Sequence, residues 1–182
     1  MIVDPTRVFE LLVGLGDVTV LGAVDEPDGP VIVHVETRAD RPSCPGCGGS
    51  VWAKDQRPVE LVDLPAFGRP ARLVWHKRRW SCPDSACALG SFTEAVGRIA
   101  AARLVMTDRA GRWATEQVGR FHRSVNELAV ELGCDWHTIN DTVIAYGTPL
   151  IEDPARIGDV DALGLDETLF ARLVAQQLRS DL

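Results

Sequence analysis

Five cysteines are the residues whose type and spacing could support metal chemistry in this chain of 182 residues. Four of them form two short-spaced pairs, Cys44 with Cys47 in CPGCGG and Cys82 with Cys87 in CPDSAC. Each pair can place two thiolates on one side of a turn, and four thiolates together make the tetrahedral sulfur set of structural zinc. Such a set leaves no coordination position open for a substrate. The spacing therefore predicts a structural zinc ion bound by these four residues.

Two other interpretations of the cysteines, buried free thiols and a redox pair, explain the sequence less well. Buried free cysteines would not explain two turns that each carry a proline after the leading cysteine, and a redox pair would need a thioredoxin-like βαβ context that the sequence lacks. His76 is a candidate substitute ligand, although its place in the middle of a strand favours a surface residue. Cys134 is expected to be a buried apolar residue and not a fifth ligand.

A β-hairpin is the element expected to bring the two cysteine pairs together. The 34 residues between Cys47 and Cys82 read as strands over 51–54, 59–62 and 71–82. The last of these mixes aromatic and basic side chains, including Lys77, Arg78 and Arg79, which suits a strand lying against a polyanion. Upstream, 17–24 and 30–36 read as two strands around the acidic turn DEPDG, and 5–14 reads as a short helix.

The net charge of −7 is unevenly distributed along the chain. Residues 41–123 hold fourteen Lys and Arg against seven Asp and Glu, a net charge of +7, whereas 1–40 carry −6 and 124–182 carry −8. A basic middle segment fits a local contact with nucleic-acid phosphates, because phosphate neutralisation requires cations within a Debye length. A solvated basic face explains the charge equally well, so charge alone leaves both interpretations open.

From Leu104 onward the period of the apolar residues becomes helical, with Met106, Ala110, Trp113 and Phe121 on one side. Arginines occupy the other faces of this first helix. Ser124 and Glu127 form a capping box that opens a second helix, and Gly133 lies where a helix ends with a left-handed residue.

Asp135 can then cap a third helix over 136–146, whose inner face carries Ile139 and Val143. Ala129 is small enough for two helices to cross closely, Gly133 makes the turn, and the aliphatic Ile139 fills the core between the helices. This combination predicts a helix-turn-helix. The third helix has no Lys or Arg in 136–146 and carries Asp141, which counts against a base-reading helix. Asn140 is the candidate adenine reader. The residues expected to contact a DNA groove are Trp136, His137, Thr138 and Asn140, with Arg120 and Arg123 on phosphates together with the basic strand.

The order of these motifs resembles the N-terminal part of bacterial insertion-sequence transposases of the ISL-three type. The resemblance includes the CPxCG knuckle, the basic strand ending in RRW-x-C, the distal CP-x3-C with its following Phe-x-Glu (SFTE), the segment ELAVELGCDWHTIND and a strand ending in GLDE. In that family, the zinc-binding and helix-turn-helix modules bind the terminal inverted repeats of the element. A DDE catalytic domain of ribonuclease-H-like fold then cuts and joins DNA with two divalent metal ions.

The resemblance makes Asp166 the counterpart of the family's first catalytic carboxylate. The sequence continues for only sixteen residues beyond Asp166, so we expect a vestigial residue, a truncated transposase and no enzyme activity, with Mg²⁺ required only in a full-length family member. The alternatives are a small transcriptional regulator with the same modules, or a structural zinc module that binds a protein partner. Duplex DNA is the expected partner, with a second copy of the chain as a further one.

The expected fold is α+β and multi-modular. It comprises a β-rich lead-in over 1–40, a zinc finger over 41–96, a helix-turn-helix domain over 97–152 and the start of a ribonuclease-H-like domain over 153–182. Glu10 and Asp17 interrupt the N-terminal apolar run, which argues against a membrane span or a signal peptide. We therefore expect a cytoplasmic protein associated with the nucleoid.

Overall fold

The computed structural model describes residues 13–25, 27–156 and 158. Most of the helix expected over 5–14 lies outside this part of the chain, as do Asp166 and the strand expected to carry it. A compact unit, Met1–Pro149, contains the sheet and nearly all of the helical segment, and a second unit comprises Leu150–Leu182. In the described residues, no helix is long and apolar enough to cross a membrane.

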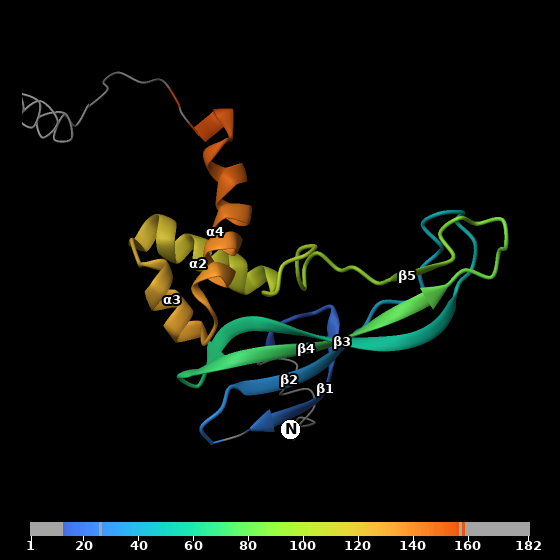
Figure 1. Cartoon of the computed structure of the whole chain (residues 1–182), viewed down its shortest axis with the longest axis horizontal. Coiled ribbons are helices and arrows are strands. Elements are labelled where there is room, and N and C mark those ends of the chain that lie inside the picture. Colours follow the sequence, from blue (N-terminus) through green and yellow to red (C-terminus); the bar gives the residue numbers. More distant parts are fainter. Residues whose placement is uncertain (1–12, 26, 157, 159–182) are drawn as a thin grey trace, which may run out of the picture. The chain divides into compact units, whose positions relative to one another are not determined.

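A five-stranded mixed sheet forms the first half of the compact unit (Figure 1). The hydrogen-bonded order is β1-β2-β4-β3, and a short fifth strand pairs with β4 outside this path. The strands are β1 (Val18–Asp25), β2 (Val31–Thr37), β3 (Trp52–Ala66), β4 (Arg69–Ser81) and β5 (Ser91–Thr93). The two upstream strands predicted from the sequence are confirmed with a shift of one residue.

Strand β2 runs parallel to β4, with Val33 opposite Leu73, whereas β1 and β2 pair antiparallel. The sheet therefore joins strands from the segments 1–40 and 41–96, which the sequence-based division places in separate modules. Because parallel neighbours require a crossover connection, the chain between β2 and β4 has room for the first cysteine knuckle and the whole of β3.

The prediction of separate strands over 51–54 and 59–62 is wrong, because β3 runs unbroken through both. A register shift between Ala53 and Asp55 accommodates an extra residue, Lys54, in the pairing with β4. Pro58 is tolerated because β3 is an edge strand of the described sheet, where a missing backbone N–H costs least.

Two hydrophobic clusters use adjacent residues of the same strand, β3. Leu61 packs with Leu73 and Trp75 in one cluster, and Val62 packs with Met106 and the helices in another. Neighbouring strand residues point to opposite faces of a sheet, so β3 supplies both clusters. Trp75 is 1% exposed and its indole Nε1 donates to Thr37 Oγ1 at 2.9 Å.

Three helices follow the sheet, α2 (Asp108–Phe121), α3 (Val125–Leu132) and α4 (Trp136–Ile151), and a short 3-10 helix covers Pro154–Arg156. The expectation that the helical period begins at Leu104 is wrong by four residues, because Thr107 caps α2 by accepting from Ala110 N. Met106 is buried but precedes the helix in a bridge to Val62. Phe121 ends α2 with 61% of its surface exposed, so it does not continue the apolar face.

The predicted caps of α3 and α4 are confirmed. Ser124 and Glu127 form the reciprocal capping box, and Gly133 adopts the left-handed conformation with φ 62°. Asp135 Oδ1 accepts from Thr138 N at 2.9 Å at the start of α4. The last helix extends to Ile151, beyond the predicted end at Tyr146, and includes Pro149.

Two glycines allow close packing in the helical segment. A Cβ on Gly111 would lie 2.6 Å from the Tyr146 ring, so only glycine permits this crossing of α2 and α4. A Cβ on Gly133 would lie 2.9 Å from Pro70, at the start of β4. Arg72 donates to the backbone carbonyls of Leu132 and Gly133. The turn between α3 and α4 is therefore fixed to the hairpin end of β4.

Candidate metal centre and nucleic-acid interface

The first cysteine pair lies in a tight loop. A bridge between Ser43 and Ser50 closes the loop, and Cys44 N donates to Gly49 O at 2.8 Å. Gly48 has φ 74°, a left-handed value that L side chains rarely adopt. The Pro-Gly and Gly-Gly content of CPGCGG thus explains why this segment turns sharply enough to aim both sulfurs inward.

The second cysteine pair lies in a similar loop after β4. Cys82 N donates to Gly90 O at 2.8 Å, and Cys87 N donates to Asp84 O at 3.1 Å. The Asp84 side chain accepts from Ala86 N at 2.9 Å, which stabilises the turn between the two cysteines. Strand pairing of Trp52 with Ser81 brings this loop beside the first one, as the hairpin prediction required.

The four sulfurs form one compact cluster. The Sγ atoms of Cys44, Cys47, Cys82 and Cys87 all lie within 4.8 Å of one another. The separation is 3.7 Å between Cys44 and Cys87, and 3.6 Å between Cys47 and Cys82. Tetrahedral Zn²⁺ with Zn–S bonds of about 2.3 Å separates its sulfurs by about 3.8 Å. The donor set and its spacing therefore fit a structural zinc ion, and none of the four is in a disulfide.

The thiols do not ionise independently in this cluster. Burial disfavours the Cys44 thiolate, but hydrogen bonds from backbone N–H groups of Gly46 and Cys47 lower its pKa to about 7. A backbone hydrogen bond at Asp84 favours the Cys82 thiolate, yet burial and the three neighbouring sulfurs raise its pKa to about 12. Several adjacent thiolates repel one another, so full ionisation of the cluster requires a bound cation.

A small apolar cluster supports the metal centre. Val51 and Trp80 are buried with Cys44 and Cys82, and Phe92 packs against them from β5. Phe92 lies opposite Trp80 in the strand register. The first residue of the Phe-x-Glu motif therefore holds the distal cysteine loop against the hairpin.

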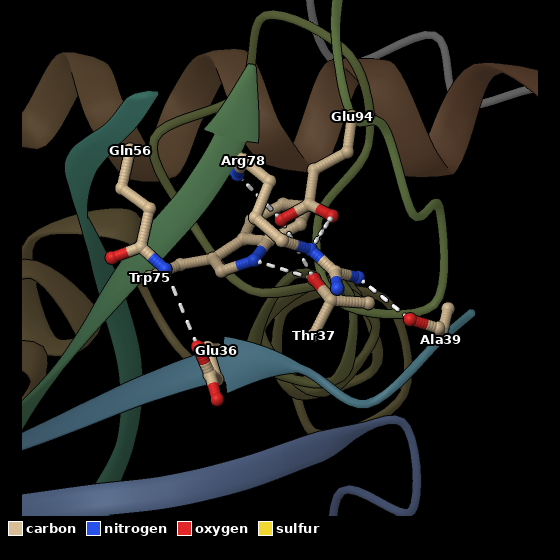
Figure 2. A network of polar contacts seen from close by, with 7 residues as sticks. All are labelled: Glu36, Thr37, Ala39, Gln56, Trp75, Arg78 and Glu94. Atoms are coloured by element: carbon tan, nitrogen blue, oxygen red, sulfur yellow. Dashed lines mark hydrogen bonds and ion pairs between the residues drawn. The ribbon is translucent and has the colours of Figure 1, made fainter. Parts of the chain in front are cut away.

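The glutamate of the same motif is the centre of a polar network (Figure 2). The side chain of Glu94 is 8% exposed and accepts from Arg78 Nε at 3.1 Å and from the Arg78 backbone N at 2.8 Å. Thr37 Oγ1 also donates to it, at 3.0 Å. Arg78 Nη2 donates to Ala39 O at 2.8 Å. Arg78 is thus engaged within the protein.

The other two basic residues predicted on this strand have other partners than Glu94. Lys77 Nζ lies 4.3 Å from the centre of the Trp75 ring, and Arg79 forms an ion pair with Asp55 at 3.1 Å. The alternation of side chains along β4 therefore separates Lys77 and Arg79 from Arg78. Contact of these three residues with DNA remains a prediction.

The predicted phosphate contacts on the helices also have protein partners. Arg120 pairs with Glu116 at 2.8 Å one helical turn away, and it remains largely exposed. Arg123 pairs with Glu131, and its guanidinium lies 6.0 Å from the centre of the Trp113 ring. An exposed pair such as Arg120 with Glu116 is weak enough to be exchanged for a phosphate.

The residues predicted to contact a DNA groove all lie in the first turns of α4. Trp136 and His137 are exposed, with their rings edge to face at 5.3 Å. Thr138 donates its hydroxyl proton to Asp135 at 2.8 Å, so this hydroxyl contributes to the cap. Asn140 is partly exposed. These positions are separate from Lys77 and Arg79, because the α3–α4 turn contacts Arg72, five residues before Lys77 along β4.

Sequence reasoning missed exposed residues on the other strand of the hairpin. Trp52 is 59% exposed, and the Arg41 guanidinium lies 5.7 Å from the centre of its ring. Arg57 is exposed and lies directly opposite Lys77 in the strand register. The register between β3 and β4 would have identified Arg57 as the neighbour of Lys77. The sequence analysis did not predict this register, because it divided β3 into two strands.

The remaining predicted side chains have defined places. His76 is partly buried on the sheet, and its Nε2 lies 3.0 Å from His34 Nδ1, apart from the four-sulfur cluster. Cys134 packs against the helical cluster and is likewise outside the metal centre. Burial raises the pKa of the Cys134 thiol, which fits an inert thiol.

Residues 40–87 match a family model described as the zinc-finger of transposase IS204/IS1001/IS1096/IS1165. All four cysteines of the metal centre fall within this match. Comparison with curated proteins gave no match, and comparison with solved structures gave none either. The chain therefore contains a zinc ribbon of transposase type, which supports the resemblance of this region to the N-terminal region of such transposases.

Proposed function

We propose that this chain is the DNA-binding N-terminal portion of an ISL-three-type transposase and recognises the terminal inverted repeats of an insertion sequence. The observation that carries the proposal is the four-sulfur cluster inside the segment that matches a transposase zinc-finger model. Zinc bound by Cys44, Cys47, Cys82 and Cys87 would hold the two loops together and would have no catalytic role.

In this proposal, α3 and α4 act as a helix-turn-helix that recognises the base sequence of the DNA. Two observations support it: the turn is fixed by Gly133, and the start of α4 presents Trp136 and His137 to solvent. Asn140 lies one turn further along the helix, where its side-chain amide would accept one hydrogen bond from an adenine base and donate another to it. Phosphate contacts from Arg120 and Arg123 would orient the helix in the groove.

The catalytic part of the proposal concerns Asp166, which lies outside the described residues. By resemblance it would be the first carboxylate of a DDE site, and Mg²⁺ would be needed only where the complete set of family carboxylates is present. We propose that this chain alone does not cleave DNA. A cytoplasmic, nucleoid-associated location and assembly into a homodimer are further parts of the proposal.

The experiment that tests the function compares affinities for three duplexes of equal length, one from a terminal repeat, one from a promoter and one of random sequence. We expect the zinc-loaded protein to bind the repeat about 1,000-fold or more tightly than the random duplex, within the range of specific DNA-binding proteins. Preference for the promoter would instead support a transcriptional regulator. Failure to bind any duplex in a salt-dependent manner would reject DNA binding and favour a zinc module that binds a protein.

A further inference from the structure

Most basic side chains of the described sheet and helices are already paired with carboxylates. Ion pairs hold Arg69, Arg72, Arg78, Arg79, Arg98, Arg109, Arg112, Arg120 and Arg123. Arg57 and Lys77 form no ion pair in the described part of the chain, although both lie on the β3–β4 hairpin. Lys54 on the same hairpin forms none either, and Arg41, Arg103 and Arg156 are the residues outside it, among those described, for which the same holds.

Arg57 and Lys77 are direct cross-strand neighbours. Residues opposite each other on antiparallel strands have Cβ atoms about 5 Å apart on one face of the sheet, and like charges in that position are destabilising. Lys77 is half-buried against Trp75, which reduces the screening of its charge by water. An anion placed between the two side chains would remove the repulsion.

The same face continues toward the metal centre. The register places Val59 opposite Trp75, then Arg57 opposite Lys77, Asp55 opposite Arg79 and Trp52 opposite Ser81. Trp75 belongs to the core, so this row of paired residues begins at the edge of the core and ends at the exposed indole of Trp52. Asp55 already neutralises Arg79. The unpaired cations are those of Arg57 and Lys77.

Arg41 adds a third cation at the end of this face. Its guanidinium lies against the Trp52 ring, and it forms no ion pair among the described residues. A guanidinium stacked on an indole keeps its N–H groups available at the edge of its plane for phosphate, while the ring offers an apolar surface to a sugar. Arg78, by contrast, is bound to Glu94 within the protein (Figure 2).

We propose that the DNA backbone lies along this face, the hairpin stripe, defined by Arg41, Trp52, Arg57 and Lys77. The proposal rests on the proposed function, because it assigns phosphate contacts within the same DNA complex. Arg57 takes the role of phosphate contact that the sequence analysis expected of Arg78, and Arg41 is a further contact near the metal centre. These contacts are independent of base sequence, whereas the start of α4 reads the bases.

The test uses the zinc-loaded full chain and the variant Arg57→Ala/Lys77→Ala. We expect the slope of log K against log salt to become shallower by about 1.8, because each lost phosphate contact contributes about 0.9. Repeat and random duplexes should be affected alike. The matched control is Arg103→Ala/Arg156→Ala, which removes the same charge from exposed positions outside the hairpin that also form no ion pair among the described residues. Circular dichroism and zinc content establish that both variants are folded.

Equal slopes for the wild type and the hairpin variant would overturn the stripe while leaving the proposed function intact. An equal change in both double variants would also overturn it, since net charge alone would then account for the effect. If wild-type protein binds no duplex, the proposed function itself fails. Tighter binding to poly-glutamate than to DNA at equal charge, lost in the hairpin variant, would assign the stripe to an acidic protein partner and overturn DNA contact.

Discussion

Arg78 Nε donates to Glu94 Oε2 at 3.1 Å, joining the strand between the two cysteine loops to the segment that follows the second loop. The Glu94 side chain, which is 8% exposed, also accepts from Thr37, which in turn accepts from Trp75. One carboxylate thus links β2, β4 and the Phe-x-Glu motif. Its role is to hold the metal centre against the core, because Phe92 packs on the metal side and Glu94 binds on the core side.

We expect Glu94→Ala to lower the free energy of unfolding by about 2–4 kcal/mol, because it leaves the partly buried Arg78 charge without its carboxylate. Urea unfolding followed by circular dichroism measures this loss. The control Glu116→Ala removes an exposed carboxylate paired with Arg120 and should cost less than about 1 kcal/mol. Equal losses in the two variants would contradict the role of Glu94 as a link.

Replacing one metal ligand should unfold the zinc ribbon. Thiolate coordination of structural zinc supplies folding free energy on the order of 10 kcal/mol, so Cys44→Ser and Cys87→Ser should each reduce zinc from one ion per chain to nearly none. Metal analysis after dialysis measures the content. Cys134→Ser should retain full zinc, since this thiol packs in the helical cluster. Unchanged zinc in both ligand variants would reject the site.

The proposed contact of α4 with base edges predicts a loss of affinity that depends on the DNA sequence. Asn140→Ala and His137→Ala should weaken binding to repeat DNA by about 1–3 kcal/mol more than binding to random DNA, if each makes a good base contact. Fluorescence anisotropy on both duplexes measures the difference. Asn126→Ala is a suitable control, because Asn126 is an exposed amide on α3. Equal losses on both duplexes would assign Asn140 and His137 to the phosphate backbone.

The caps of α3 and α4 predict a contribution to stability that depends on pH. Backbone and side-chain hydrogen bonds at Ser124 lower the pKa of Glu127 from 4.5, and those at Thr138 lower the pKa of Asp135 from 3.8. Because both folded pKa values are lowered, the stabilisation is complete above the ordinary values. It is lost as pH falls through the folded ones.

Unfolding curves between pH 6 and pH 3 should therefore show a steeper loss of stability for the wild type than for Glu127→Gln/Asp135→Asn. Zinc release at low pH affects both proteins, so the difference between their curves isolates the two caps. Parallel curves would show that these carboxylates do not favour the folded state.

Asp166→Asn should change neither DNA affinity nor stability appreciably. The proposal assigns Asp166 no catalytic role by itself, because one carboxylate cannot hold the two metal ions of a DDE site. Incubation of labelled repeat DNA with Mg²⁺ should give no nicked product. Nicking that disappears in the Asp166→Asn variant would contradict this and would require carboxylates from a partner chain.

Local chemistry explains what could be predicted from the sequence. The paired cysteines with Pro and Gly determine two turns, and the Ser124 capping box, Gly133 and Asp135 determine the ends of helices, because these effects depend on residues within a few positions of one another. The zinc ligands and the turn between α3 and α4 were therefore predictable. The four sulfurs need only an antiparallel hairpin to meet, and the spacing of the pairs implies one.

Long-range pairing decided the rest, because register and strand order depend on contacts between residues far apart in the chain. Only the tertiary structure shows that β2 joins β4, that β3 is a single strand, and that Leu61 and Val62 contribute to different clusters. The basic run Lys77, Arg78 and Arg79 looks uniform in the sequence. The sheet gives its members opposite faces and different partners, Trp75, Glu94 and Asp55, and brings Arg57 beside Lys77.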